Sequence, residues 1–187
     1  TAFNYLHQSI LEEYKQHLKA QKEDMKSISV SGNILDYLYL IAITGEEVPV
    51  ANTEAYTYYL SKVSELLSSS SEDAKAVAAI VLTKAGKVDE AQKFIASLKE
   101  YLTKTDEQGM FFDFNDNPYT WSGMKLRAHV TVMEALSLVG GNDAIVEEMK
   151  LWLLKQKQTQ QWRSPLASVD AIYALLMNGT NLLDNQE

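Results

Sequence analysis

Four glycines, Gly45, Gly86, Gly140 and Gly179, each follow a stretch of mostly apolar residues. Glycine tolerates the left-handed backbone conformation in which many helices end, so each of these glycines is expected to close an apolar helix. A charged, amphipathic pattern follows each of the first three. The glycines are roughly 40 to 54 residues apart, a spacing typical of repeated helical hairpins. This recurrence predicts an all-α chain of antiparallel hairpins, in which inner apolar helices alternate with outer charged ones.

The hydrophobic periodicity predicts about eight helices. Amphipathic patterns place outer helices at residues 2–22, 53–67, 88–103 and 143–157, and apolar patterns place inner helices at residues 34–43, 74–82, 124–139 and 165–178. The exception is the stretch 109–121, where alternation around Met110, Phe112 and Phe114 predicts a short extended or hairpin segment. The serines at 68–71 are interpreted as a tight turn, because the helical pattern resumes directly after them. We expect a single helical domain over 1–187, as a fragment of a larger multidomain protein.

The last apolar helix is expected to begin at Pro165, because Ser164 can accept a backbone N–H and proline at the first helical position has no donor to lose. Ser31 is the corresponding cap of the first apolar helix. Apolar residues cover most of the circumference of the last helix, which predicts burial on nearly every side: Ala167, Val169, Ala171, Ile172, Ala174, Leu175 and Leu176. Four charged residues of the preceding helix are expected to face water: Glu147, Glu148, Lys150 and Lys155.

The charge balance, 17 Lys+Arg against 25 Asp+Glu, gives a net charge of −8 and argues against nucleic acid as a partner, since binding phosphates requires clustered cations. The chain has no cysteine, which excludes disulfides, thiolate metal ligands and thiol nucleophiles within it. No apolar run reaches the about 18 residues of a membrane span, so direct membrane insertion is not expected. The first residues lack the pattern of a signal peptide, and any export signal is expected outside this chain.

The three histidines are the natural candidates for acid–base chemistry. His129 and Glu134 are the one pair that suggests it, but five residues along a helix point the two side chains to different faces. His129 is therefore interpreted as a buried or rim histidine with satisfied hydrogen bonds. His7 and His17 are interpreted as surface charges on an outer helix. No catalytic residue, metal ligand or cofactor is predicted.

Two further groups suggest ligands. The oxygen-rich residues Asp113, Asn115, Asp116 and Asn117 lack the glycine and the glutamate of a calcium-binding loop, so a turn is favoured. Trp121 and Trp162 resemble the Gln/Trp elements of terpene-cyclising toroids, whose aromatic faces stabilise cations. Neither an Asp-rich initiation motif nor a zinc-binding set accompanies them, so packing at the mouth of a hairpin is favoured.

The second half of the chain carries a family resemblance. The run from Trp152 through Gln161 and Trp162 to Ser168-Val-Asp-Ala-Ile-Tyr-Ala-Leu resembles the hairpin repeat of the α/α-toroid superfamily, most closely the thioester-type domain of bacterial alpha-2-macroglobulin-like proteins. Tyr119, Trp121, His129 and Glu134-Ala-Leu are similar to the preceding repeat. The resemblance is good over 109–179 and only architectural before it. It implies a partial α/α-toroid, with fewer hairpins than a closed one.

The same resemblance implies a non-catalytic interaction domain of a periplasmic, cell-envelope or secreted protein that traps or inhibits proteases. Other domains of the parent chain, and proteases, would be its partners. Its candidate binding residues are Tyr119, Trp121, His129 and Trp162. Many toroids of this family hold a Cys-x-Glu-Gln thioester, which a chain without cysteine does not contain.

Two alternatives from other classes stay open. A toroid enzyme acting on isoprenoids or polysaccharides would need a cluster of carboxylates facing a deep central cavity. A tetratricopeptide-like scaffold is suggested by Ala85-Gly-Lys-Val-Asp-Glu-Ala91, but the regular spacing of about 34 residues in such repeats does not match the glycine spacings.

Overall fold

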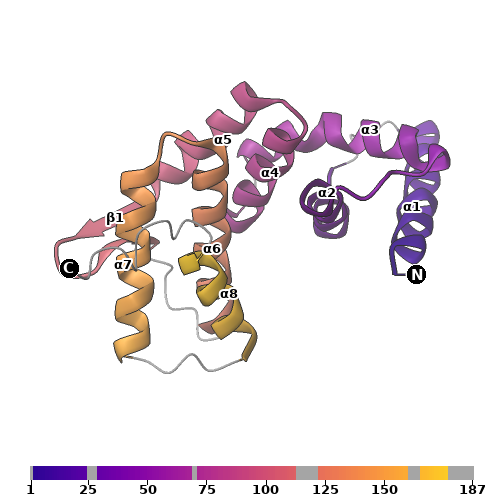
Figure 1. Cartoon of the computed structure of the whole chain (residues 1–187). Coiled ribbons are helices and arrows are strands. Elements are labelled where there is room, and N and C mark those ends of the chain that lie inside the picture. Colours follow the sequence, from indigo (N-terminus) through magenta and orange to yellow (C-terminus); the bar gives the residue numbers. More distant parts are fainter. Residues whose placement is uncertain (1, 25–28, 69–70, 113–121, 160–164, 177–187) are drawn as a thin grey trace. The chain divides into compact units, whose positions relative to one another are not determined.

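The structure is a computed structural model that describes residues 2–24, 29–68, 71–112, 122–159 and 165–176. Within these ranges the chain is all-α with one small β-hairpin, which confirms the predicted fold class. It divides into two compact units, residues 1–94 and 95–187, which are described separately. The single domain expected over 1–187 stays a prediction. Figure 1 labels the helices α1 (Ala2–Asp24), α2 (Gly32–Thr44), α3 (Thr53–Lys62), α4 (Glu72–Lys84), α5 (Val88–Glu100), α6 (Ser122–Val139), α7 (Asp143–Thr159) and α8 (Pro165–Leu176).

Several helix ends lie where the sequence places them. The side chain of Ser31 accepts a hydrogen bond from the Ile34 amide at 3.4 Å and so caps the start of α2. Gly45 ends α2 in the left-handed conformation, with φ of 69°, and its N–H donates to the Ile41 carbonyl at 3.0 Å. Gly86 and Gly140 also have positive φ angles, after α4 and α6. These results confirm the predicted stops, except for Gly179, which lies outside the described residues.

In the first unit α2 packs against α4, and α1 packs against α2 and α3. Two short 3-10 helices, η1 (Val50–Asn52) and η2 (Val63–Ser68), flank α3. Hydrogen bonds join α1 to its neighbours: the Nδ1 atom of His7 lies 2.9 Å from the Tyr37 hydroxyl, and that of His17 lies 2.9 Å from the Tyr59 hydroxyl. The side chain of Asn52 donates to the His7 carbonyl at 2.6 Å.

The prediction that His7 and His17 are surface charges is therefore wrong. His7 is buried and His17 is partly buried, each against a tyrosine of another helix. Both rings also meet these tyrosines edge-on, at centroid distances of 5.7 and 6.0 Å. The physical reason is that α1 is amphipathic and both histidines lie on its packed face, so their ring nitrogens bond to protein hydroxyls instead of water.

In the second unit two short strands form an antiparallel hairpin, β1 (Leu102–Thr105) and β2 (Gly109–Phe112), in which Leu102 pairs with Phe112. The strand β2 confirms the extended segment predicted from residue 109, and residues 113–121 lie outside the described ranges. The helix predicted to reach about Thr103 is too long, because α5 ends at Glu100. The sequence Leu-Thr-Lys-Thr is rich in β-branched residues, and pairing with β2 satisfies its backbone better than a last helical turn.

The hairpin lies against α7. The strand β2 comes close to the backbone of α7 at Gly109, because a Cβ atom added there would come within 2.3 Å of the Glu148 carbonyl oxygen. Its φ angle of 76° also favours glycine. A salt bridge of 3.0 Å between Lys104 of β1 and Glu148 of α7 joins the same elements. The hairpin therefore covers one side of α7.

The helix α6 packs against both α7 and α8 (Figure 1). Ala171 and Ala174 of α8 are buried, which confirms that this alanine face is packed. The prediction that α8 is buried on nearly every side is wrong, since four of its large side chains are exposed: Val169, Ile172, Tyr173 and Leu176. Its neighbours in the second unit cover only one side of the helix.

One of the charged residues expected to face water is also buried. Lys150 of α7 is 4% exposed, and its Nζ atom donates to the Glu147 carboxylate at 2.7 Å. Glu147 itself is exposed, as predicted, and Glu148 and Lys155 are partly exposed. A lysine can be buried in this way because its long stem packs among apolar atoms while its charge is paired at the surface.

Candidate functional site

His129 is the candidate binding residue that the structure describes. Tyr119, Trp121 and Trp162, the other three candidates from the sequence, lie outside the described residues, as does the oxygen-rich loop at 113–117. His129 lies on α6, which places it against α7, and only 1% of its surface is exposed. The prediction of a buried histidine is confirmed. Its surroundings determine what chemistry it can do.

One ring nitrogen of His129 has a clear role. Its Nε2 atom lies 3.1 Å from the main-chain carbonyl oxygen of Met149 on α7. Because a carbonyl oxygen only accepts hydrogen bonds, Nε2 must carry the proton and donate it. In the neutral imidazole the other nitrogen, Nδ1, is then unprotonated and acts only as an acceptor. The hydrogen bond therefore fixes one tautomer.

The second ring nitrogen has no hydrogen-bond partner among the described residues, although it is buried. The expectation that the hydrogen bonds of His129 are satisfied is thus correct for Nε2 and wrong for Nδ1. Most buried polar atoms in proteins are paired, so an unpaired one calls for an explanation. The face of the His129 ring lies against the indole of Trp152, with centroids 4.3 Å apart, and this contact offers no hydrogen-bond donor to the in-plane lone pair of Nδ1.

Three aromatic side chains are layered at this place. The His129 ring of α6 packs on Trp152 of α7 at an interplanar angle of 33°, and Trp152 stacks on Phe111 of β2 at 6.1 Å and 14°. Each ring comes from a different element. The cluster of His129, Trp152 and Phe111, called here the aromatic layer, therefore joins α6, α7 and the hairpin, as the aromatic contacts that stabilise protein cores commonly do.

Burial lowers the pKa of His129 to about 4, and the hydrogen bond to the Met149 carbonyl opposes this shift only in part. The ring is therefore neutral at pH 7. A general base must reach both its substrate and the exchanging proton, and the 1% exposure of His129 leaves no such access. The arrangement supports a packing role for His129.

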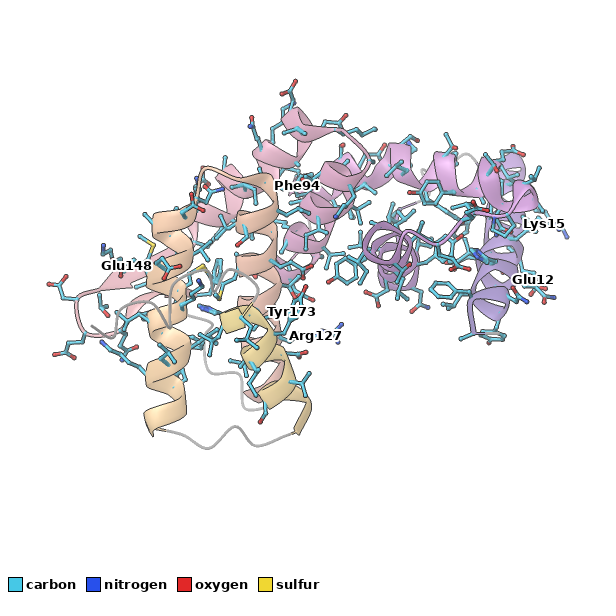
Figure 2. All side chains as sticks on the ribbon, viewed as in Figure 1. Glu12, Lys15, Phe94, Arg127, Glu148 and Tyr173 are labelled. Carbon is cyan, nitrogen blue, oxygen red and sulfur yellow. The ribbon has the colours of Figure 1, made fainter. Side chains whose placement is uncertain are left out.

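Among the described residues, neither ring nitrogen of His129 bonds to Glu134. Burial and, to a lesser extent, the negative charge of Glu134 raise the pKa of Tyr173, a residue of α8 that is labelled in Figure 2. The carboxylate therefore lies near the hydroxyl group of Tyr173. This placement agrees with the expectation that the spacing of His129 and Glu134 points them to different faces of α6.

Within the described ranges, no group of three or more His, Cys, Asp or Glu side chains is arranged to hold a metal ion. In the same part of the chain, no helix combines the length and apolar character needed to cross a membrane. Figure 2 shows Glu12 and Lys15 projecting from α1, and both are exposed. These side chains belong to a charged outer face.

Sequence reasoning missed the hydrogen bonds of His7 and His17, although a signal was present. His7, Ile10, Tyr14 and His17 are three or four residues apart, which is the spacing of one helix face. Ile10 and Tyr14 are buried, so the histidines beside them lie on the packed side of α1. Tyr14 also donates from its hydroxyl to Glu54 at 3.1 Å. A histidine in register with an apolar stripe should therefore be interpreted as a packed residue.

Comparison of the chain with protein-family models, with curated proteins and with solved structures found no match.

Proposed function

We propose that this chain is a non-catalytic interaction domain of a bacterial alpha-2-macroglobulin-like protein, part of an α/α-toroid of the thioester type. Support comes from the sequence resemblance over 109–179 and from the alternation of apolar and amphipathic helices. The family resemblance also supports an exported parent protein, in the periplasm, cell envelope or outside the cell, that traps proteases.

The exposed apolar face of α8 is the observation that carries this proposal. Val169, Ile172, Tyr173 and Leu176 are 61%, 50%, 51% and 69% exposed. They follow one another at i, i+3, i+4 and i+7, so they form one stripe along the helix. Contiguous exposed apolar surface of this kind marks an interaction site. The stripe is called here the α8 face.

The size of the α8 face favours a partner within the same polypeptide. A helix of 12 residues is about 18 Å long and about 10 Å wide. Its footprint is well below the surface area that each partner buries in a stable complex of separate proteins, about 800 Å². A tethered segment binds such a small surface more readily, because the linkage supplies a high effective concentration. Other domains of the parent chain are therefore the proposed occupants of the α8 face.

Protease trapping is tested with the parent polypeptide. A trapped protease keeps its own active site but is surrounded by the trap, so it should cleave a small chromogenic peptide at an unchanged rate and a large protein substrate much more slowly. Equal loss of both activities would indicate a conventional active-site inhibitor. No loss of either would rule out trapping.

The role of the α8 face is tested separately. Ile172→Glu in the parent polypeptide should lower its melting temperature, because a charge would be buried in the interdomain contact. Val50→Glu is the matched control, since Val50 is 93% exposed on η1 and the same charge there stays in water. Equal melting temperatures for the two variants would mean that the α8 face is not covered in the parent polypeptide.

A further inference from the structure

Of the three residues in the aromatic layer, His129 is the one whose ring can be protonated. Its Nε2–H bonds to the Met149 carbonyl, and its ring face lies on Trp152. We propose that His129 makes the packing of these elements sensitive to acid. Its neutral ring holds α7 and the hairpin against α6, and its protonation weakens that packing. This inference goes beyond the proposed function and does not depend on it.

The geometry of the ring explains why protonation would weaken the packing. A proton on Nδ1 turns that atom from an acceptor into a donor, and no acceptor bonds to it among the described residues. The Met149 carbonyl already binds Nε2 and lies on the other side of the ring. The face of Trp152 attracts a cation, which reduces the penalty, but it accepts no hydrogen bond in the ring plane of His129. A buried charge would therefore remain without its second partner.

Charged groups on the neighbouring elements do not relieve this charge. On α7, Glu148 pairs with Lys104 and Lys150 pairs with Glu147. The strand β2 has no ionisable side chain, and α8 contributes Asp170 and Tyr173. The ionisable residues of α6 closest to His129 in the sequence are Lys125, Arg127 and Glu134. The pKa of His129 nevertheless responds only to burial and to the Met149 carbonyl.

The expected pH dependence follows from the direction of this shift. The pKa of His129 is about 4 in the folded chain and 6.5 for an ordinary histidine. Above about pH 6.5 both states are neutral at this position and the packing is at full strength. As the pH falls toward about 4, the unfolded state binds a proton that the folded state does not. The equilibrium constant for unfolding then rises by up to about tenfold per pH unit, on the order of a hundredfold in total.

The test compares urea unfolding of the whole chain at about pH 7 and about pH 4.5. His129→Gln keeps an N–H group close to the position of Nε2 but cannot be protonated. The wild-type chain should be weakened by acid much more than His129→Gln, by a further factor on the order of a hundred in the unfolding constant. His7→Gln is the matched control, since His7 is also buried but has a hydroxyl partner at Nδ1. This variant should keep the acid sensitivity of the wild-type chain.

A second measurement covers the case in which His129→Gln does not fold. Nitrogen-15 NMR of the histidine rings in the wild-type chain reports the protonation of His129 directly. The ring should remain in the Nε2–H form down to about pH 5, and its protonation should coincide with loss of the Trp152 and Phe111 ring-current shifts. An identical acid sensitivity of the wild type and His129→Gln, or protonation of His129 without any change at Trp152, would overturn the proposal.

Discussion

The helices α4 and α8 are both rich in alanine and aliphatic residues, but they have very different surroundings. Both are short, and both are expected from the sequence to be inner helices. In α4, every residue from Lys75 to Leu82 is buried. In α8, Ala171 and Ala174 are buried, whereas the α8 face is exposed.

The difference comes from how closely the neighbouring elements surround each helix. The helix α4 packs against α2 and η2 within the first unit. In the second unit α8 packs mainly against α6. An apolar sequence thus indicates what a helix is able to bury, and the elements around the helix decide how much of it is buried.

The largest expected effect contrasts the same substitution in the two helices. Ile80→Ala in α4 should cost about 2–5 kcal/mol, because Ile80 is fully buried and its truncation leaves a cavity. Ile172→Ala in α8 should cost about 1 kcal/mol or less, because half of that side chain already faces water. Urea unfolding followed by circular dichroism measures both values. Equal losses of stability would mean that Ile172 is covered and that the contrast between α4 and α8 is incorrect.

A smaller effect is expected on the packed side of α8. Ala171→Phe should cost about 1–3 kcal/mol, since Ala171 is fully buried and a ring would have to separate α8 from its neighbours. Glu148→Gln serves as the control, because the partly exposed salt bridge of Glu148 with Lys104 contributes at most about 1 kcal/mol. Melting temperatures of the two variants give the comparison. If Ala171→Phe were as stable as Glu148→Gln, the alanine face of α8 would not be a packed surface.

The smallest effect on stability is expected on the α8 face itself. Leu176→Ser should change the free energy of unfolding by no more than about 0.5 kcal/mol, because Leu176 is mostly exposed. The same variant should bind less of the dye ANS, which reports exposed apolar surface. A loss of several kcal/mol would show that Leu176 packs within this chain, and the proposed docking surface would then not exist.

The sequence by itself determined the local features of this protein. Ser31 and Gly45 set the ends of α2 through hydrogen bonds to residues three or four positions away, so the residues involved are neighbours in the chain. Helical periodicity likewise depends on nearby residues, and it predicted the helices α1 to α8 with errors at their ends. The largest is in α3, which was expected to reach residue 67 but ends at Lys62, where the 3-10 helix η2 follows. These interactions form wherever the local sequence allows them.

The tertiary structure alone decided the surroundings of each residue. The strand β1 forms because β2 is present to pair with it, and His7 is bonded to Tyr37 from 30 residues away. The burial of His129 was expected, but its unpaired Nδ1 and its contact with Trp152 depend on how α6 meets α7. The same holds for the buried Lys150 and the exposed α8 face. The burial and pairing of a residue depend on elements that are distant from it in the sequence, so the local sequence alone does not determine them.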